Sequence, residues 1–248
     1  MLRYARNDEK CCGLEISRYR SRMTDLRQDT PAAPLTLPLG LFALAVLYGG
    51  MTCIAGVLGS KQVGLGALPG FGPLAVEAGI FPFLLLVSLS SAVAELYGRT
   101  TADRLVRFGF IPLITAIALT YIVIQLPTDP GMYEPAKEAF PIILGQSGRL
   151  MAAGIIAYGV SMSLNVFIFA KLSRGSARLV AVRAAIASVL SQIVDTLIFI
   201  TVAFYGVRPI ADLIVGQALA KVILSIVMVP LLIMLLVSIG RRLDRRPA

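Results

Sequence analysis

Six stretches of the sequence are long and apolar enough to cross a lipid bilayer as helices. A helix needs about 20 residues to cross a hydrocarbon core of roughly 30 Å. The stretches run approximately over 38–58, 75–96, 105–126, 149–170, 181–206 and 210–238. Across the chain 57% of the residues are hydrophobic and 15% are charged, whereas soluble domains are about 45–50% apolar and about 25% charged. We therefore expect an all-α integral membrane protein with six transmembrane helices.

Prolines and glycines mark particular points in these stretches and their connections. Pro82 and Pro230 fall inside the second and sixth stretches, so we expect a kink at each. The connection over 127–148 is too polar and proline-rich at its start to span, although its later part, AFPIILG, is apolar enough to enter the membrane interface. The segment GLGALPGFG over 64–72 has no expected strand before it, so we interpret it as a turn in an outer loop.

Lysine and arginine are concentrated in alternate connections. Of the 23 basic residues, 18 lie in the first 36 residues, in 97–107, in 171–183 and in the terminal RRLDRR. The other connections carry Lys61, Lys137 and Arg208. Cytoplasmic connections of membrane proteins are enriched in lysine and arginine. The distribution predicts that both termini are cytoplasmic, and it accounts for the net charge of +9 without a nucleic-acid partner.

Three regions follow from this pattern. Residues 1–36 mix acidic and basic side chains without a long apolar run, which indicates a disordered cytoplasmic tail. We expect a six-helix transmembrane domain over 37–240 and a basic cytoplasmic tail over 241–248. The first apolar stretch begins too far into the chain for a cleavable signal peptide, and the predicted location is the cell inner membrane.

Polar side chains on the fourth and fifth stretches share helical faces. In the fifth, Ser188, Gln192 and Asp195 follow helical spacing, and Asp195 lies near the middle of its span. When the fourth stretch is aligned with the fifth at an offset of 30 residues, Met162 and Asn165 correspond to Gln192 and Asp195. A charge at mid-bilayer costs about 2.5–3.5 kcal/mol on insertion scales, so such residues usually face a bundle interior or a watery cavity. The alignment predicts that Asn165 and Asp195 meet near mid-membrane, as in transporters built from repeats.

Lys221, in the sixth stretch, is a second charge within the membrane, and Gln217 lies one turn before it. One interpretation is a structural ion pair with Asp195 that holds the fifth and sixth helices together. The other is that the pair lines a substrate cavity, where Asp195 accepts N–H donors and Lys221 or Gln217 binds a carbonyl.

Two further charges lie at the ends of the spans. We expect Glu95, at the cytoplasmic end of the second helix, to pair with a nearby arginine. Arg149, at the start of the fourth helix, is placed either to extend outward or to reach an outer loop carbonyl.

Signatures of catalysis and metal binding are missing from the sequence. There is no histidine, and Cys11, Cys12 and Cys53 lack the spacing of a zinc or iron–sulfur site, so we expect unpaired thiols. HExxH, GxSxG and Walker A motifs are also missing. We therefore expect neither an enzyme nor a bound cofactor or metal.

Three segments of the sequence can be compared with known membrane proteins, namely FPFLLLVSLSSAVAELYGRTTADRLVRFGF, ASVLSQIVDTLIFITVAFYG and GQALAKVILSIVMVP. Together they resemble the queuosine precursor transporters of the vitamin-uptake-like family. The matching residues are Glu95, Tyr97, Gly98, Ser191, Gln192, Asp195, Thr196, Phe199, Gln217, Lys221 and Pro230, with Lys61 and Arg149 where the family usually has basic residues. The similarity runs from about residue 50 to residue 235. It departs at Ser91 and Asn165, where the family has aspartates, and at Met162, where it has glutamine.

The resemblance implies uptake of a 7-deazaguanine base across the inner membrane for queuosine synthesis. With two carboxylates missing, the cavity should bind fewer N–H donors or a less basic molecule. The expected substrate-binding residues are Gln192, Asp195, Thr196, Asn165, Ser91, Gln217 and Lys221, and the expected gating or structural polar residues are Glu95, Arg149 and Ser191. The alternatives are a substrate-binding subunit that depends on a separate ATP-driven module, and a membrane scaffold whose Asp195 and Lys221 only pack helices. A homo-oligomer is also compatible with the sequence.

Overall fold

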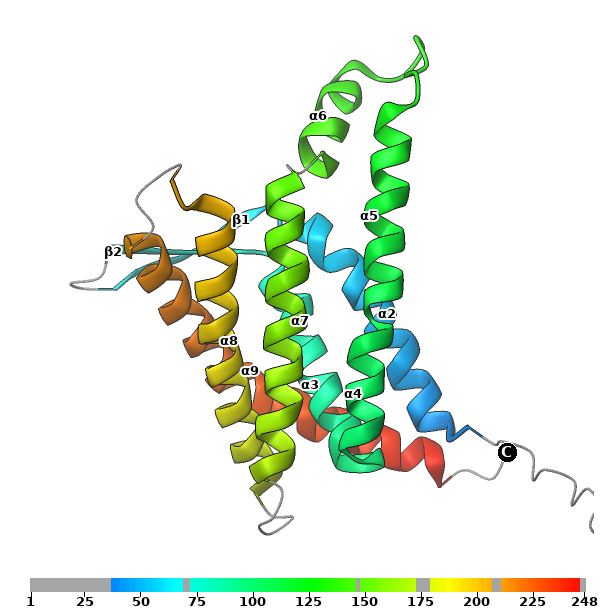
Figure 1. Ribbon diagram of the computed structural model, residues 1–248, viewed down its shortest axis with the longest axis vertical. Helices are drawn as coiled ribbons and strands as arrows, with labels where there is room; N and C mark the ends of the chain where they lie inside the picture. The colour runs from blue at the N-terminus through cyan, green and yellow to red at the C-terminus, as the bar shows by residue number, and fades with distance from the viewer. Residues whose placement is uncertain (1–36, 69–71, 146–147, 173–178, 207–210, 246–248) are drawn as a thin grey trace, which may run out of the picture. The chain divides into compact units, whose positions relative to one another are not determined.

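The expected apolar stretches form helices in a computed structural model of the chain (Figure 1). The structure describes residues 37–68, 72–145, 148–172, 179–206 and 211–245. The helices that carry the stretches are α2 (Leu39–Leu58), α3 (Ile80–Tyr97), α4 (Arg99–Phe108), α5 (Phe110–Gln125), α7 (Gly148–Lys171), α8 (Val180–Phe204) and α9 (Ala211–Asp244). With α4 and α5 taken together, 6 of the described segments are long and apolar enough to cross a membrane. The prediction of a six-span, all-α membrane protein is confirmed.

The third span is divided at Gly109, between the charged helix α4 and the apolar helix α5. A Cβ atom at Gly109 would lie 2.7 Å from the ring of Tyr48 and would overlap the hydroxyl of Tyr158. The hydroxyls of these tyrosines are 2.7 Å apart. Glycine is therefore required here for close packing, because any side chain would displace this buried tyrosine pair.

A β-hairpin replaces the outer turn that we expected over 64–72. Strand β1 (Gln62–Leu68) pairs antiparallel with β2 (Gly72–Glu77), and Gln62 lies opposite Glu77. The prediction that no strand precedes Gly64 was wrong, because glycines interrupt the alternating pattern by which a strand is recognised. Gly66, whose φ is +92°, lies where the register shifts, a position that favours glycine.

The hairpin also moves the start of the second span. Residues 75–77, which we assigned to that span, belong to β2, and α3 begins only at Ile80. Pro82 therefore lies in the first turn of α3, where its missing N–H costs no helical hydrogen bond. The reason for expecting a kink at Pro82 is thus removed, whereas Pro230 does lie in the interior of α9.

The connection over 127–148 contains one short helix, α6 (Glu134–Leu144). Its 11 residues are too few to cross a bilayer. Figure 1 shows α6 beside the upper end of α5 and above α7, and its apolar residues Ile142 and Ile143 contribute to a cavity described below.

Helix α3 lies at the centre of the bundle. In the apolar part of α3, 61% of the residues are buried, against 6% for the span formed by α4 and α5. Helix α7 packs along α8 and α8 along α9, while α3 contacts α2, α7 and α9. Figure 1 shows α7 beside α8, with α5 set apart from them. The core is therefore built around α3, α7, α8 and α9.

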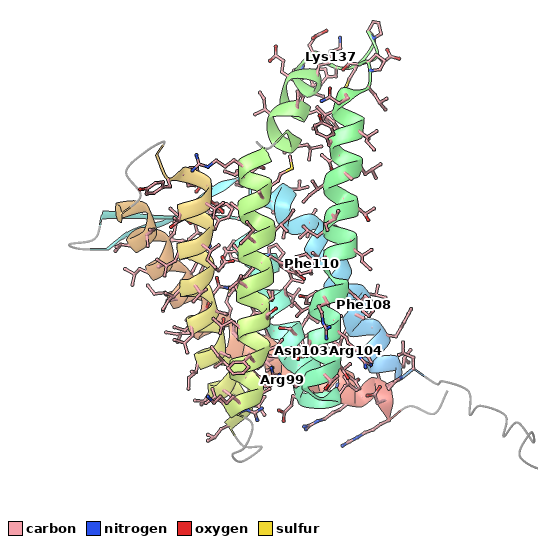
Figure 2. The ribbon with its side chains drawn as sticks, in the orientation of Figure 1. Arg99, Asp103, Arg104, Phe108, Phe110 and Lys137 are labelled. Atoms are coloured by element: carbon pink, nitrogen blue, oxygen red, sulfur yellow. The ribbon has the colours of Figure 1, made fainter. Side chains whose placement is uncertain are left out.

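The helix ends define two faces of the bundle. The Gly40 N–H and the Tyr97 hydroxyl donate to the Asp244 carboxylate at 2.8 and 2.7 Å, so the start of α2 and the ends of α3 and α9 share one face. We call it the terminal face, and we call the opposite face, where β1, β2 and α6 lie, the hairpin face. In Figure 2, Arg99 and Arg104 lie near the terminal face, whereas Lys137 lies at the far end of the molecule.

The two expected tails are only partly described. The described residues from Pro38 onward form one compact unit. Helix α9 continues to Asp244, so Arg241 and Arg242 are helical. The expected tail over 1–36, with Cys11 and Cys12, lies outside the described residues, as do Arg174, Arg178, Arg208 and residues 246–248.

Candidate functional site

A cavity of about 500 Å³ lies in the half of the bundle nearer the hairpin face. Its walls come from the hairpin, from α6 and from α2, α3, α5, α7, α8 and α9. The aromatic side chains Phe83, Tyr158 and Phe199 are among its lining residues. Among the described lining residues, the charged ones are Glu77, Asp195 and Lys221. A mostly apolar cavity of this size with a few convergent polar groups is typical of a small-molecule site.

Asp195 and Lys221 form a direct ion pair on the cavity wall. The Lys221 Nζ lies 3.2 Å from the Asp195 Oδ2, and their side chains are only 7% and 10% exposed. The Ser161 hydroxyl donates to the other carboxylate oxygen of Asp195 at 3.2 Å. The predicted contact between the two charges is confirmed, and it links α8 to α9. Both residues also line the cavity.

Glu77 is a third charged residue at this site, and it is absent from the site residues expected from the sequence. It ends β2, and Gln217 of α9 is close enough to hydrogen-bond to its side chain. Burial raises the pKa of the Glu77 carboxyl above its ordinary value, and the charge of Asp195 adds to this, while Lys221 and Gln217 act in the opposite direction. Its position inside the expected span over 75–96 was the available signal, since a carboxylate there needs a polar environment.

Asn165 binds α3, whereas we expected it to face Asp195. Its Nδ2 donates to the Ser90 and Ser91 hydroxyls, both at 3.1 Å, and to the Val87 carbonyl at 3.3 Å. The contact to Asp195 across the α7–α8 interface comes instead from Ser161, one turn nearer the hairpin face. Asn165 and Ser91 are therefore brought together, but neither lines the cavity.

The other predicted residues of α8 lie in a buried layer beside the cavity and do not line it. Gln192 and Thr196 are fully buried, and the Thr196 hydroxyl donates to the Gln192 carbonyl. The Ser191 hydroxyl likewise donates within α8, to the Ser188 carbonyl. Both side-chain amide atoms of Gln192 lack a hydrogen-bond partner among the described residues, as does the amide oxygen of Asn165. Unpaired buried amides indicate a place for water or ligand atoms.

Glu95 pairs with Arg183 toward the terminal face. Arg183 Nη2 lies 3.0 Å from Glu95 Oε2, and the guanidinium stacks over Phe169 at 4.4 Å from the ring centroid. The expected arginine partner is thus present. Arg183 falls both in the expected fifth span, 181–206, and in the basic connection 171–183; the structure places it in the first turns of α8, where it is 5% exposed. Its pairing and stacking offset the cost of burying the charge.

Arg149 holds the end of α8 at the hairpin face. Its guanidinium donates to the carbonyls of Val202 and Tyr205, each at 2.6 Å. The second of our two alternatives, a carbonyl partner, is therefore observed, with the partners at the α8 terminus. A cation suits this place, because the last carbonyls of a helix carry partial negative charge. Arg149 does not line the cavity.

The sequence model of the family described as "Putative vitamin uptake transporter" matches residues 77–235, a range that includes Glu77, Asp195 and Lys221. The chain belongs to this family. With its six apolar helices, this member of the vitamin uptake transporter family is a multi-pass membrane protein. The family we identified from sequence motifs is confirmed.

One curated relative is similar over much of the matched region. The "Probable queuosine precursor transporter" of Bacillus subtilis (strain 168) is 30% identical over 143 residues, which cover 55% of this chain. The alignment spans about 61% of the length of that relative. No solved structure matches the chain. Within the described part of this family member, no group of three or more acidic or cysteine side chains is arranged to hold a metal ion.

Proposed function

We propose that this protein takes up a small purine-like molecule, a 7-deazaguanine precursor of queuosine, across the cell inner membrane. The observation that carries the proposal is the cavity of about 500 Å³ with the Asp195–Lys221 pair on its wall. The family and the name of the Bacillus subtilis relative support it. The protein acts by binding and moving its substrate, without chemical conversion.

The cavity chemistry suits a flat, hydrogen-bonding base. A guanine-like edge presents N–H donors beside a carbonyl acceptor, and Asp195 accepts hydrogen bonds while the neighbouring Lys221 donates them. Phe83 and Phe199 line the same cavity and offer aromatic faces for a planar ring. Substrate binding would replace the direct ion pair by two bridged contacts, so neither charge would be left alone. Gln192, Thr196, Asn165 and Ser91, which do not line the cavity, would bind the base in a later state.

The orientation of the protein forms part of the proposal. With both termini cytoplasmic, the hairpin face points out of the cell, and the cavity lies on the side from which a substrate arrives. The buried layer around Gln192 and Asn165 then closes the path inward. The described conformation would be a state ready to load substrate.

A packing role for the ion pair is the competing interpretation, and the direct 3.2 Å contact favours it. A separate energy-coupling module remains part of a second transport model, in which this chain would only bind and release the substrate. The packing interpretation gives the cavity no use, whereas both transport models use it to bind substrate.

The deciding experiment is uptake of labelled 7-deazaguanine precursors in cells that cannot synthesise them. Cells with the chain should accumulate label and restore queuosine in their tRNA, whereas cells with an empty vector should not. Excess unlabelled precursor should compete, while an unrelated pyrimidine should not. Equal accumulation in both strains, at confirmed abundance of the protein in the membrane, would refute the proposal.

A further inference from the structure

Two carboxylates and one ammonium share the wall of the cavity. Asp195 comes from α8, Lys221 from α9 and Glu77 from the end of β2. The remaining titratable side chains among the described lining residues are Cys53 of α2 and Tyr158 of α7. Lys61, just before β1, is exposed and does not line the cavity. When both acids are ionised, this largely apolar cavity therefore carries one uncompensated negative charge.

The geometry shows which acid is left without its own cation. Asp195 has the Lys221 ammonium at 3.2 Å and the Ser161 hydroxyl at 3.2 Å. Glu77 has the neutral amide of Gln217 beside it and experiences Lys221 only as a neighbouring charge. An unpaired carboxylate in an apolar place favours its protonated form. The raised pKa of the Glu77 carboxyl agrees with this, and burial is its largest cause.

Substrate binding would strengthen that preference. If the Lys221 ammonium donates a hydrogen bond to the substrate carbonyl, it compensates the negative charge of the carboxylates less. An ionised Glu77 would then lie farther from any positive charge. Occupation of the cavity also displaces the water that would otherwise solvate an ionised Glu77. A group whose proton affinity rises on ligand binding must, by linkage, raise ligand affinity when it is protonated.

We propose that Glu77 is a proton-binding site coupled to the substrate cavity, so that the protein takes up one proton together with each substrate molecule. The proposal rests on the proposed function. The proton leaves water at the hairpin face and forms an O–H bond with a Glu77 carboxylate oxygen. After the cavity opens to the other side, that O–H bond breaks and the proton returns to water with release of the substrate. The driving force would thus be a proton gradient, with no ATP-driven module required.

The test uses the purified full-length protein in liposomes with a trapped pH dye and a labelled 7-deazaguanine precursor. Binding and counterflow exchange are first measured at equal pH on both sides. Substrate added outside should then acidify the interior of wild-type liposomes, and an inward gradient of one pH unit should raise the uptake rate by up to about tenfold, the limit for one linked proton. Glu77→Gln cannot take up a proton at this position. The ratio of its uptake rate with the gradient to its uptake rate at equal pH should therefore be near one.

Glu134→Gln is the matched control. Glu134 lies in α6, its side chain is 75% exposed, and it pairs with Lys137 outside the cavity. This variant should show the gradient dependence of the wild type. If Glu77→Gln fails to fold, substrate-driven acidification by the wild type still tests the coupling without any variant.

Each outcome bears on a different part of the proposal. Wild-type binding and exchange without proton entry would overturn the coupling and leave the proposed function standing. Full gradient dependence in Glu77→Gln would overturn the assignment to Glu77. Failure of the wild type to bind or exchange the labelled precursor would overturn the proposed function, and the coupling would be overturned with it.

Discussion

Among the helical residues whose burial the structure describes, each buried charge has a specific partner. Asp195 contacts Lys221 and Ser161, and Arg183 contacts Glu95 and the ring of Phe169. These partners are what make charges tolerable between membrane helices. The two pairs nevertheless differ in surroundings, because Asp195 and Lys221 line a cavity and the Glu95–Arg183 pair does not. Only the first pair is therefore a candidate for substrate recognition.

Replacing Asp195 by asparagine should weaken substrate binding. Asparagine keeps the shape but adds N–H donors that oppose the donor edge of a guanine-like base. We expect a loss of about 1.5–3 kcal/mol, the scale of a hydrogen bond to a charged group. Uptake of labelled precursor at measured membrane abundance is the readout. The variant should still insert, because removal of a mid-membrane charge lowers the cost of insertion.

A double variant separates binding from packing. Asp195→Asn leaves Lys221 without its carboxylate partner, so it should be compared with the variant that also carries Lys221→Met. If the double variant regains both abundance and uptake, the pair was structural. If abundance returns while uptake stays lost, Asp195 belongs to the site. Normal uptake by the single variant at normal abundance would contradict a role in binding.

At the scale of elements, the junction of α4 and α5 is held by close packing on the Tyr48–Tyr158 pair. Phe110, the first residue of α5, stacks edge-on against Tyr158 at 5.1 Å between ring centroids. Figure 2 shows Phe108 and Phe110 on either side of this junction. No residue of α5 is itself buried, so this contact and the packing of α5 on α2 and α6 position the helix beside the cavity.

Gly109→Ala should destabilise the protein. The added methyl group overlaps the Tyr158 hydroxyl, and overpacking of this kind costs about 1–3 kcal/mol. Gly50→Ala in α2 is the matched control, since its Cβ would meet no atom within 4 Å. It should be neutral or slightly stabilising, because alanine is the better helix former. Thermal unfolding of the two variants in detergent measures the difference, and equal melting temperatures would contradict the packing argument.

At the scale of the whole molecule, basic residues separate between the two faces. Arg99, Arg104 and Arg241 belong to the terminal face, whereas Lys61 and Lys137 lie toward the hairpin face. This agrees with the alternation seen along the sequence and predicts that the terminal face is cytoplasmic. Under that orientation the cavity, including Glu77, faces the outside.

Cysteine labelling of intact cells tests the orientation. In a variant with Cys11, Cys12 and Cys53 replaced by serine, a thiol at the exposed position Asp129 should react with a membrane-impermeant reagent. A thiol at the exposed position Arg104 should react only after the cells are opened. The reverse pattern would invert the topology and place the cavity toward the cytoplasm.

The candidate site could be predicted only in part from the sequence. Asp195 and Lys221 were identified because opposite charges on consecutive spans require partners, and they lie 3.2 Å apart. Asn165 was assigned the wrong neighbour, since helical spacing defines a face but not the helix that packs against it. Glu77 was missed because its place at the cavity depends on the β-hairpin. It is the last residue of β2, and the hairpin positions that end of the strand at the cavity wall.

What the sequence determined by itself was the number of spans, their approximate ends and the polar faces of the helices. These properties depend on runs of neighbouring residues, and burial in lipid demands the same apolar length from every helix. Only the tertiary structure decided that Asn165 binds α3, that Arg183 is buried over Phe169, and that Glu77 joins the Asp195–Lys221 pair. Such contacts depend on the rotation and depth of helices that are distant in the chain, and local periodicity leaves both undefined.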